Sequence, residues 1–202
     1  MSCHLEVSYG SGMKSMVYFV GIKSFTLHSC VACNVKNQEM RLIMEYLTDY
    51  EKINLMLSRL IADHSYTIAN LANASALLYQ ELPDINWAGF YLYEDGQLVL
   101  GPFQGKVACI EIAMGKGVCG TAAKSCETLL VPDVHAFVGH IACDSASNSE
   151  IVVPIVKNGE LFGVLDIDSP VKNRFSENDK AGLEAFADIL KQGISFGRKA
   201  GY

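Results

Sequence analysis

Apolar residues recur at helical spacing in two segments that follow Thr48 and Asp49, residue types that favour the N-cap of a helix. The first segment carries its stripe at Ile53, Met56, Leu57, Leu60 and Ile61. The second carries Ile68, Leu71, Ala72 and Leu78, with the small Ser75 on the same face. Because side chains three or four positions apart share one face of a helix, the pattern predicts two amphipathic helices ahead of the first strand.

Apolar and β-branched runs separated by turn residues predict two β-hairpins. The first covers residues 87–100 and turns at 94–96, which contain Asp and Gly. The second covers residues 150–167 and turns at 157–159, which contain Asn and Gly. Hairpin strands are antiparallel, so an antiparallel sheet is expected.

Between the hairpins we expect a strand over 107–113 and a short helix over 118–124. Ser176 and Asp179 have the spacing of a capping box. The stripe that follows predicts a closing helix and consists of Leu183, Phe186, Ala187, Leu190 and Ile194. The order of these elements predicts an α+β domain in which a central antiparallel sheet carries its helices mainly on one face.

Length and composition agree with a single folded domain. The chain has 202 residues, of which 50% are hydrophobic and 19% charged, a globular composition rather than a disordered one. Residues 1–40 show no sustained period of two or 3.6 and are interpreted as a weakly ordered N-terminal extension. The net charge of −6 disfavours a nucleic-acid partner.

No run of apolar residues approaches the ~18 that a membrane span requires, and the apolar run at 16–22 is short even for a signal peptide. We therefore predict a cytoplasmic protein without a membrane segment. In that compartment seven cysteines indicate reactive thiols, metal ligands or buried packing rather than a disulfide scaffold. Cys30 and Cys33 form a CxxC pair without a βαβ setting and are interpreted as incidental.

Four cysteines lie between the glycine-rich loops of the middle segment: Cys109, Cys119, Cys126 and Cys143. Their spacings contain no CxxC pair, so a structural zinc site is not predicted and no metal is expected. Cys126 is interpreted as a small buried hydrophobe or an idle thiol. The other three stand beside glycines, where the backbone can approach a ligand closely.

Acidic residues are the second candidate ingredient of a site. Asp166 and Asp168 alternate along one predicted strand and therefore share a sheet face, and Glu150 opens the partner strand. Two carboxylates on one face are costly to bury unless they meet a cation, donors or a proton, so a solvated strand end is the alternative. If they are partly buried, repulsion raises at least one pKa and creates an acid able to donate a proton near neutrality.

Residues 115–120 are superficially like a phosphate-binding loop, but the GxxxxGK[ST] order is absent, which disfavours nucleotide binding. A helix that begins there can still hold a carboxylate through its first amides and its dipole.

Seven ordered blocks resemble the GAF-domain free methionine-R-sulfoxide reductases, over roughly residues 45–196, followed by a short tail at 197–202. The blocks are NWAGFY (86–91), GPFQGKVAC (101–109), GKGVCGTAA (115–123), VPDV (131–134), GHIACD (139–144), SEIVVPI (149–155) and GVLDID (163–168). The resemblance implies a single GAF-like domain that reduces free L-methionine (R)-S-oxide to L-methionine.

The resemblance also implies the roles of the cysteines. Cys143 stands at the position of the nucleophile that meets the sulfoxide, and Cys109 at the position of the cysteine that resolves the product as a disulfide. Cys119 matches a third family cysteine, whose role is left open between exchange with either of the other two. The sulfenic acid left by the reaction condenses with a thiol, and an external dithiol such as thioredoxin then reduces the disulfide. No metal or organic cofactor is expected, and the family favours a homodimer.

For the substrate pocket, the resemblance implies that Glu150, Asp166 and Asp168 hold the ammonium group and the sulfoxide oxygen, and that Trp87 and Tyr91 form a wall. On its own, a lone tryptophan is more often a core residue. Two other functions remain open: a GAF-type sensor of a small molecule, and a thiol redox switch without turnover. Neither would consume methionine sulfoxide.

Overall fold

The computed structural model describes residues 48–139 and 145–195. The chain divides into two units, Met1–Met44 and Glu45–Tyr202, and all described residues belong to the second. The predicted extension over 1–40, the Cys30 and Cys33 pair, the tail at 197–202 and Cys143 lie outside the described residues. The predicted division of the chain into extension, domain and tail therefore stays a prediction.

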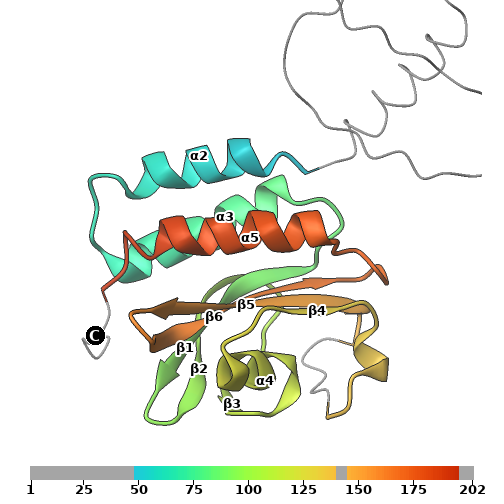
Figure 1. Cartoon of the computed structure of the whole chain (residues 1–202). Coiled ribbons are helices and arrows are strands. Elements are labelled where there is room, and N and C mark those ends of the chain that lie inside the picture. Colours follow the sequence, from blue (N-terminus) through green and yellow to red (C-terminus); the bar gives the residue numbers. More distant parts are fainter. Residues whose placement is uncertain (1–47, 140–144, 196–202) are drawn as a thin grey trace, which may run out of the picture. The chain divides into compact units, whose positions relative to one another are not determined.

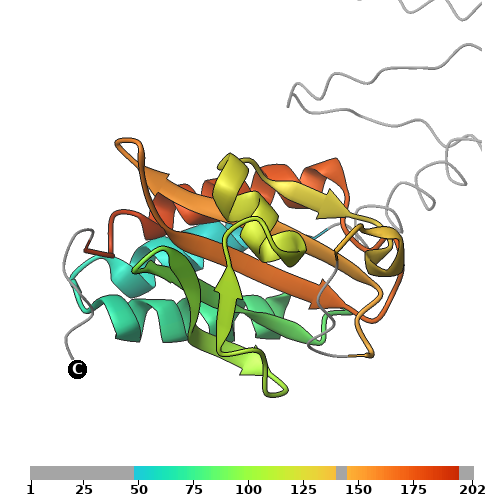
Figure 2. The same cartoon turned by 90° about the horizontal axis from the view of Figure 1, so that it is seen from below.

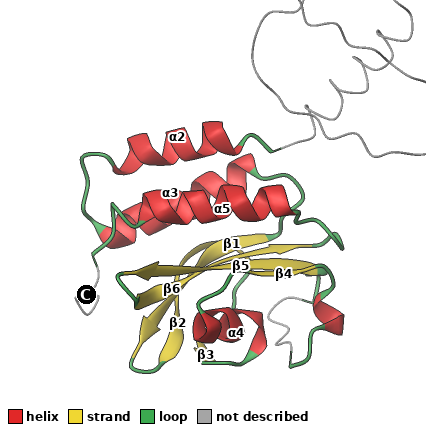
Figure 3. Ribbon diagram, in the orientation of Figure 1, coloured by secondary structure: helices red, strands yellow, loops and turns green. Residues whose placement is uncertain are grey.

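A six-stranded sheet in the order β3-β2-β1-β6-β5-β4 forms the centre of the domain (Figures 1 and 3). Its strands are β1 (Trp87–Glu94), β2 (Gln97–Gly105), β3 (Glu111–Ala113), β4 (Leu129–Val131), β5 (Ser149–Lys157) and β6 (Glu160–Ser169). Every neighbouring pair is antiparallel. The predicted α+β class with an antiparallel sheet is confirmed.

Both predicted hairpins are present, and their turns explain why they form. Asp95 and Gly96 have φ of 48° and 92°, and Asn158 and Gly159 have φ of 54° and 79°. Two consecutive residues with positive φ are the requirement of a type I′ turn, which matches the twist of the flanking strands and is met most easily by Asn-Gly and Asp-Gly. Strand β2 continues to Gly105, five residues beyond the predicted end.

Helices lie on both sides of the sheet (Figures 1 and 2). On one side, α3 (Thr67–Glu81) and α5 (Glu177–Leu190) pack on the strands, and α2 (Tyr50–Ile61) packs on these two helices. On the other side lies α4 (Gly117–Ser125). The predicted concentration of helices on one face is therefore confirmed. The Asp49 side chain caps α2 by accepting from the Lys52 amide at 3.0 Å, and the predicted capping box starts α5.

The predicted apolar stripes are right at their centres and wrong at their margins. Leu57, Leu71 and Leu78 are fully buried, but Leu60 and Ile68 are 41% and 50% exposed. Ile68 lies in the first turn of α3, where less of the protein surrounds it. Ala72 is also exposed, because the buried face of α3 is completed by Ala74 and Leu77 instead.

Strand alternation divides the interior into two cores. Ala88 and Phe90 of β1 pack with α2, α3 and α5, whereas Trp87 and Tyr91 belong to the cluster on the α4 side. Successive side chains of a strand point to opposite faces, so one strand supplies both cores. This alternation places the two aromatic residues under α4.

Two short strands mark where the sequence prediction was wrong or incomplete. The strand expected over 107–113 is confined to Glu111–Ala113, and residues 107–110 lie in a loop. β4, with only three residues, was not predicted, since so short a run shows no distinctive alternation. Among the described residues, no helix is long and apolar enough to cross a membrane.

Candidate active site

A pocket lies between α4 and the sheet and collects residues that are distant in sequence. It is lined by Trp87, Tyr91, Val107, Ala108, Ile112, Lys116, Gly117, Val118, Cys119, Ser147, Glu150, Asp166 and Asp168. Six of these are residues that the sequence singled out: both aromatic residues, all three acids and one cysteine. They come from β1, β5, β6 and α4.

The strand register brings the three carboxyl groups together. Glu150 of β5 lies opposite Asp168 of β6. Asp166 lies two residues before Asp168 in β6, on the same face of the sheet. Asp166 is 6% exposed and Glu150 5%, whereas Asp168 is half-buried. The solvated strand end considered for this segment is therefore wrong for Asp166, because α4 packs over the sheet face that carries it.

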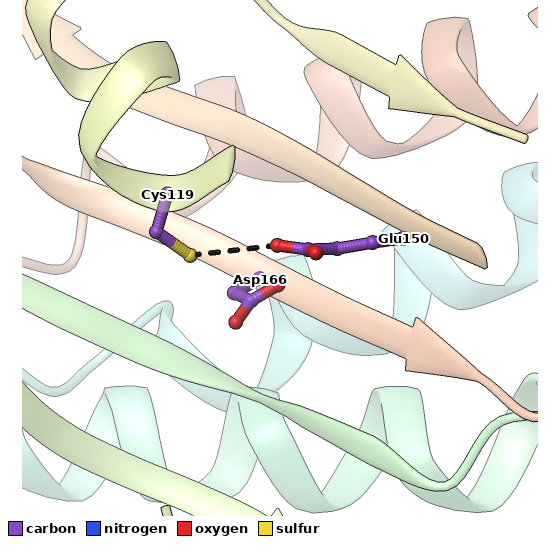
Figure 4. A group of neighbouring side chains, drawn as sticks. All are labelled: Cys119, Glu150 and Asp166. Atoms are coloured by element: carbon purple, nitrogen blue, oxygen red, sulfur yellow. Dashed lines mark hydrogen bonds between the residues drawn. The ribbon is translucent and has the colours of Figure 1, made fainter. Parts of the chain in front are cut away.

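Cys119 completes a compact buried cluster with Glu150 and Asp166 (Figure 4). The Cys119 thiol donates to Glu150 Oε1 over 3.8 Å, and one atom from each of the three side chains lies within 4.8 Å of the others. The thiol reaches the acids from α4, which crosses this face of the sheet. A sulfur atom and two carboxyl groups thus share one corner of the pocket.

Burial dominates the electrostatics of the cluster. It raises the pKa of Glu150 well above its ordinary value, helped by the charges of Asp166 and Asp168. Burial also raises the pKa of Asp166, to about 6, against hydrogen bonds from Cys119 and Glu150 that lower it. Both carboxyl groups therefore hold a proton to higher pH than a free acid does, which favours the role of a general acid.

The same surroundings keep Cys119 in its thiol form. Burial raises the pKa of the Cys119 thiol well above its ordinary value, and the neighbouring carboxylates, Asp166 first, raise it further. A thiolate is the attacking form of cysteine. Cys119 is consequently a poor nucleophile in this arrangement.

Trp87 and Tyr91 form an aromatic wall that also anchors the loop after β2. Their rings stack with centroids 6.0 Å apart, and Phe103 stacks on Trp87 at 5.2 Å. The indole Nε1 donates to the Lys106 carbonyl and the Tyr91 hydroxyl to the Cys109 carbonyl, both over 3.1 Å. Trp87 is both core and pocket wall, so the two sequence interpretations of this residue are compatible.

Among the described residues, two further cysteines lie outside the pocket lining. Cys109 is half-buried in the loop after β2, next to Ala108, which lines the pocket. Cys126 is exposed at the C-cap of α4 with φ of 55°, so its interpretation as a buried hydrophobe is wrong. The structure therefore brings Cys119 to the acids, leaves Cys109 beside the pocket, and does not describe Cys143.

The N-terminus of α4 contributes backbone donors to the pocket. Gly117, which has φ of 60°, and Val118 line it, and the first amides of a helix have no partner within the helix. Gly120 lets α4 approach β3, because a Cβ there would collide with the Ala113 carbonyl. A larger side chain at Gly120 would push the helix away from the sheet.

Sequence reasoning missed Ser147, which also lines the pocket, whereas Lys116 of the lining belongs to the segment 115–120 that the sequence singled out. Ser147 is buried, and its hydroxyl accepts from Asn86 Nδ2 over 3.1 Å. Ser147 belongs to no periodic pattern or motif, so no local signal distinguished it from other loop residues.

Comparison with known proteins agrees with this architecture. The GAF domain family model matches residues 57–194. The fold and the pocket between sheet and α4 thus define a GAF domain protein. A free methionine-R-sulfoxide reductase of Escherichia coli is 57% identical over 143 residues, which are 71% of this chain and 87% of that protein.

Two solved structures carry the comparison further. The fRMsr of Staphylococcus aureus, in complex with substrate, is 51% identical with a TM-score of 0.71, over 74% of this chain and 97% of that one. The free methionine-R-sulfoxide reductase of Neisseria meningitidis, also in complex with its substrate, is 42% identical with a TM-score of 0.69. The match covers 71% of this chain and 87% of that one. The chain belongs to the free methionine-R-sulfoxide reductase family of GAF domain proteins.

Proposed function

We propose that this protein reduces free L-methionine (R)-S-oxide to L-methionine, with cysteine thiols as the source of electrons. The observation that carries the proposal is the pocket in which Cys119, Glu150 and Asp166 meet under α4. Relatives that are more than half identical bear the name of this reductase. Buried acids of raised pKa beside a thiol suit a reaction in which an oxygen atom must be protonated before it leaves.

Charge complementarity supports a free amino acid as the substrate. The acids would pair with the α-ammonium group, while the N-terminus of α4, at Gly117 and Val118, would hold the α-carboxylate. A methionine residue within a peptide lacks the ammonium group, so the buried carboxylates would lose their partner. Trp87 and Tyr91 would pack against the thioether chain.

The proposed chemistry consumes two thiols. The Cys143 thiolate attacks the sulfoxide sulfur while a carboxyl of the acid cluster protonates the oxygen. The attack forms a bond between the two sulfur atoms. The protonated oxygen then passes from the methionine sulfur to the Cys143 sulfur while that bond breaks, and its electron pair goes to methionine. Methionine leaves as the thioether, and Cys143 is left as a sulfenic acid. The Cys109 thiol then attacks that sulfur, forming a disulfide and releasing water. One sulfoxide and two thiols thus give one thioether, one disulfide and one water.

The electrostatics of Cys119 support this division of labour. Its thiol is buried against acids that disfavour the thiolate, so we assign it a place beside the proton donor rather than the role of nucleophile. Cys109 is half-buried in a loop next to the pocket, as a resolving cysteine requires. Exchange of Cys119 with the disulfide remains part of the hypothesis.

No prosthetic group is needed for this balance of atoms and electrons. An external dithiol must return the disulfide to two thiols, and we propose thioredoxin for that step. A cytoplasmic location and a homodimer are part of the same proposal. A cytoplasmic location would keep the thiols reduced between turnovers.

The test is a stereospecific assay with dithiothreitol or a thioredoxin system. Free R-sulfoxide is expected to be consumed, whereas free S-sulfoxide and a peptide-bound sulfoxide are expected to persist. A sensor or a redox switch would consume none of the three. Loss of the peptide-bound sulfoxide at an equal rate would refute the proposed substrate class.

A further inference from the structure

Three potential metal ligands converge in the buried cluster from three separate elements. Cys119 comes from α4, Glu150 from β5 and Asp166 from β6, and one donor atom of each lies within 4.8 Å of the other two. Figure 4 shows the sulfur atom and both carboxyl groups directed into the same small volume. All three residues are buried, which distinguishes them from acids that gather by chance on a surface.

One atom of this cluster is left unsatisfied. Asp166 Oδ1 is buried and has no hydrogen-bond partner within the described part of the chain. The residue is only 6% exposed and lines the pocket. A buried polar atom without a partner is unfavourable, so this oxygen indicates that a ligand with positive charge or a donor fits here.

We propose that Cys119, Glu150 and Asp166 form a binding site for a thiophilic divalent cation, with zinc as the fitting ion. Zinc accepts cysteine sulfur at ~2.3 Å and carboxylate oxygen at ~2.0–2.2 Å, and a site with three protein ligands keeps a fourth position open. Ligand atoms around a tetrahedral ion at those distances lie roughly 3.5 Å apart, so small side-chain movements would close the cluster. The ionised ligands carry three negative charges, of which the divalent cation offsets two.

Sequence spacing does not reveal this site, because closely spaced cysteine pairs are the usual sequence sign of zinc and none is present in it. Here a single cysteine joins two acids on neighbouring strands, and 31 positions separate Cys119 from Glu150. All three ligand residues line the pocket, so the fourth position would open onto it. An ion bound there would occupy the place proposed for the substrate ammonium group and would inhibit turnover, a consequence that rests on the proposed function, whereas the binding itself does not.

Cobalt(II) is the probe for the site, since a thiolate bound to cobalt produces a charge-transfer absorption band that oxygen ligands do not. The full chain is reduced with a phosphine, which avoids competition from dithiols, and titrated with cobalt. The Cys119→Ser variant is expected to show a weaker thiolate-to-cobalt absorption band than the wild-type protein and to bind one equivalent of cobalt less. Cys126→Ser, which changes an exposed cysteine on the same helix, is expected to retain both.

The carboxyl ligands provide a second arm with a matched control. Glu150→Gln and Asp166→Asn are expected to weaken cobalt binding at least about tenfold. Asp188→Asn, an exposed acid on α5, is expected to leave it unchanged. Equal cobalt spectra and stoichiometry in the wild-type protein and the Cys119→Ser variant would overturn the proposal, and so would unchanged affinity in both carboxyl variants.

The two proposals fail separately. Intact cobalt binding without methionine sulfoxide turnover would overturn the proposed function and leave the cation site standing. Turnover of methionine sulfoxide without cobalt binding at Cys119 would overturn the cation site and leave the proposed function standing. If Cys119→Ser does not fold, Cys119→Ala and the two carboxyl variants give the same decision.

Discussion

The two faces of the sheet treat buried charge in opposite ways. On the face covered by α2, α3 and α5, Asp179 accepts from the Tyr50 hydroxyl at 2.9 Å and pairs with Arg174 at 3.2 Å. These partners and the capping box lower the pKa of Asp179 although burial alone would raise it. The carboxylate is compensated by groups of the protein itself, and it fastens α5 to α2.

On the α4 face, the carboxyl groups of Glu150 and Asp166 meet each other and a thiol. No Lys or Arg side chain of the described residues forms an ion pair with either of them. Their pKa values rise, whereas that of Asp179 falls. An acid that is paired with a cationic or donor group of the protein contributes to stability. An acid that forms no such ion pair is available to a ligand.

The largest effect is expected from Cys143→Ser, which should abolish reduction of the free R-sulfoxide. A hydroxyl is a far weaker nucleophile than a thiolate at neutral pH, and the proposed sulfenic acid could not form. Initial rates with dithiothreitol measure the effect, and Cys126→Ser is the matched control with the activity of the wild-type protein. Undiminished turnover in Cys143→Ser would refute the nucleophile assignment.

Substitutions on the face covered by α2, α3 and α5 should change the stability of the protein rather than its activity. Phe186 of α5 is fully buried, so Phe186→Ala is expected to lower the free energy of unfolding by ~3–5 kcal/mol. Urea unfolding measures this change. Asp188→Ala on the exposed side of α5 should alter it by less than about 0.5 kcal/mol. Similar losses in both variants would show that this core is not tightly packed.

On the α4 face, Glu150→Gln should lower activity without lowering stability. Removal of the acid is expected to lower kcat/KM about 10²-fold or more, since proton transfer by a side chain contributes that much. Stability should be equal or higher, because repulsion from Asp166 and Asp168 disappears. Glu111→Gln, at an exposed position of β3, is the control, with wild-type values for both quantities. A loss of stability with full activity would contradict the contrast between the two faces.

The smallest effect is a pH dependence of opposite sign on the two faces. The folded-state pKa of Asp166 is raised to about 6, so its contribution to stability is fully present below its unfolded value near 4 and is lost as pH rises towards 6. The pKa of Asp179 is lowered, so its contribution is present above pH ~4 and is lost as pH falls below it.

Urea unfolding between pH 3 and 7 separates these contributions. Asp166→Asn should remove a decline in stability between pH ~4 and ~6, and Asp179→Asn should remove a decline below pH ~4. Each slope is at most about 1.4 kcal/mol per pH unit. Identical pH profiles for Asp166→Asn and the wild-type protein would show that Asp166 is not perturbed by burial.

Much of the fold was predictable because its signals are local. The Asn158-Gly159 turn selects a hairpin, the Ser176 capping box begins a helix, and alternation assigns Asp166 and Asp168 to one face. Each depends only on residues a few positions apart. Predictions weakened where the signal was short, as in β4, or where burial depended on the surrounding elements, as at Ile68.

The site divides along the same line. The sequence by itself determined which residue types were available, in what order, and which strand positions point to the same face. Only the tertiary structure decided that Cys119 lies against Glu150 and Asp166, that Asp166 Oδ1 stays without a partner among the described residues, and that Cys126 faces solvent. The reason is physical: pKa values and ligand geometry depend on distance and burial in space, and these are created when α4 packs on the sheet.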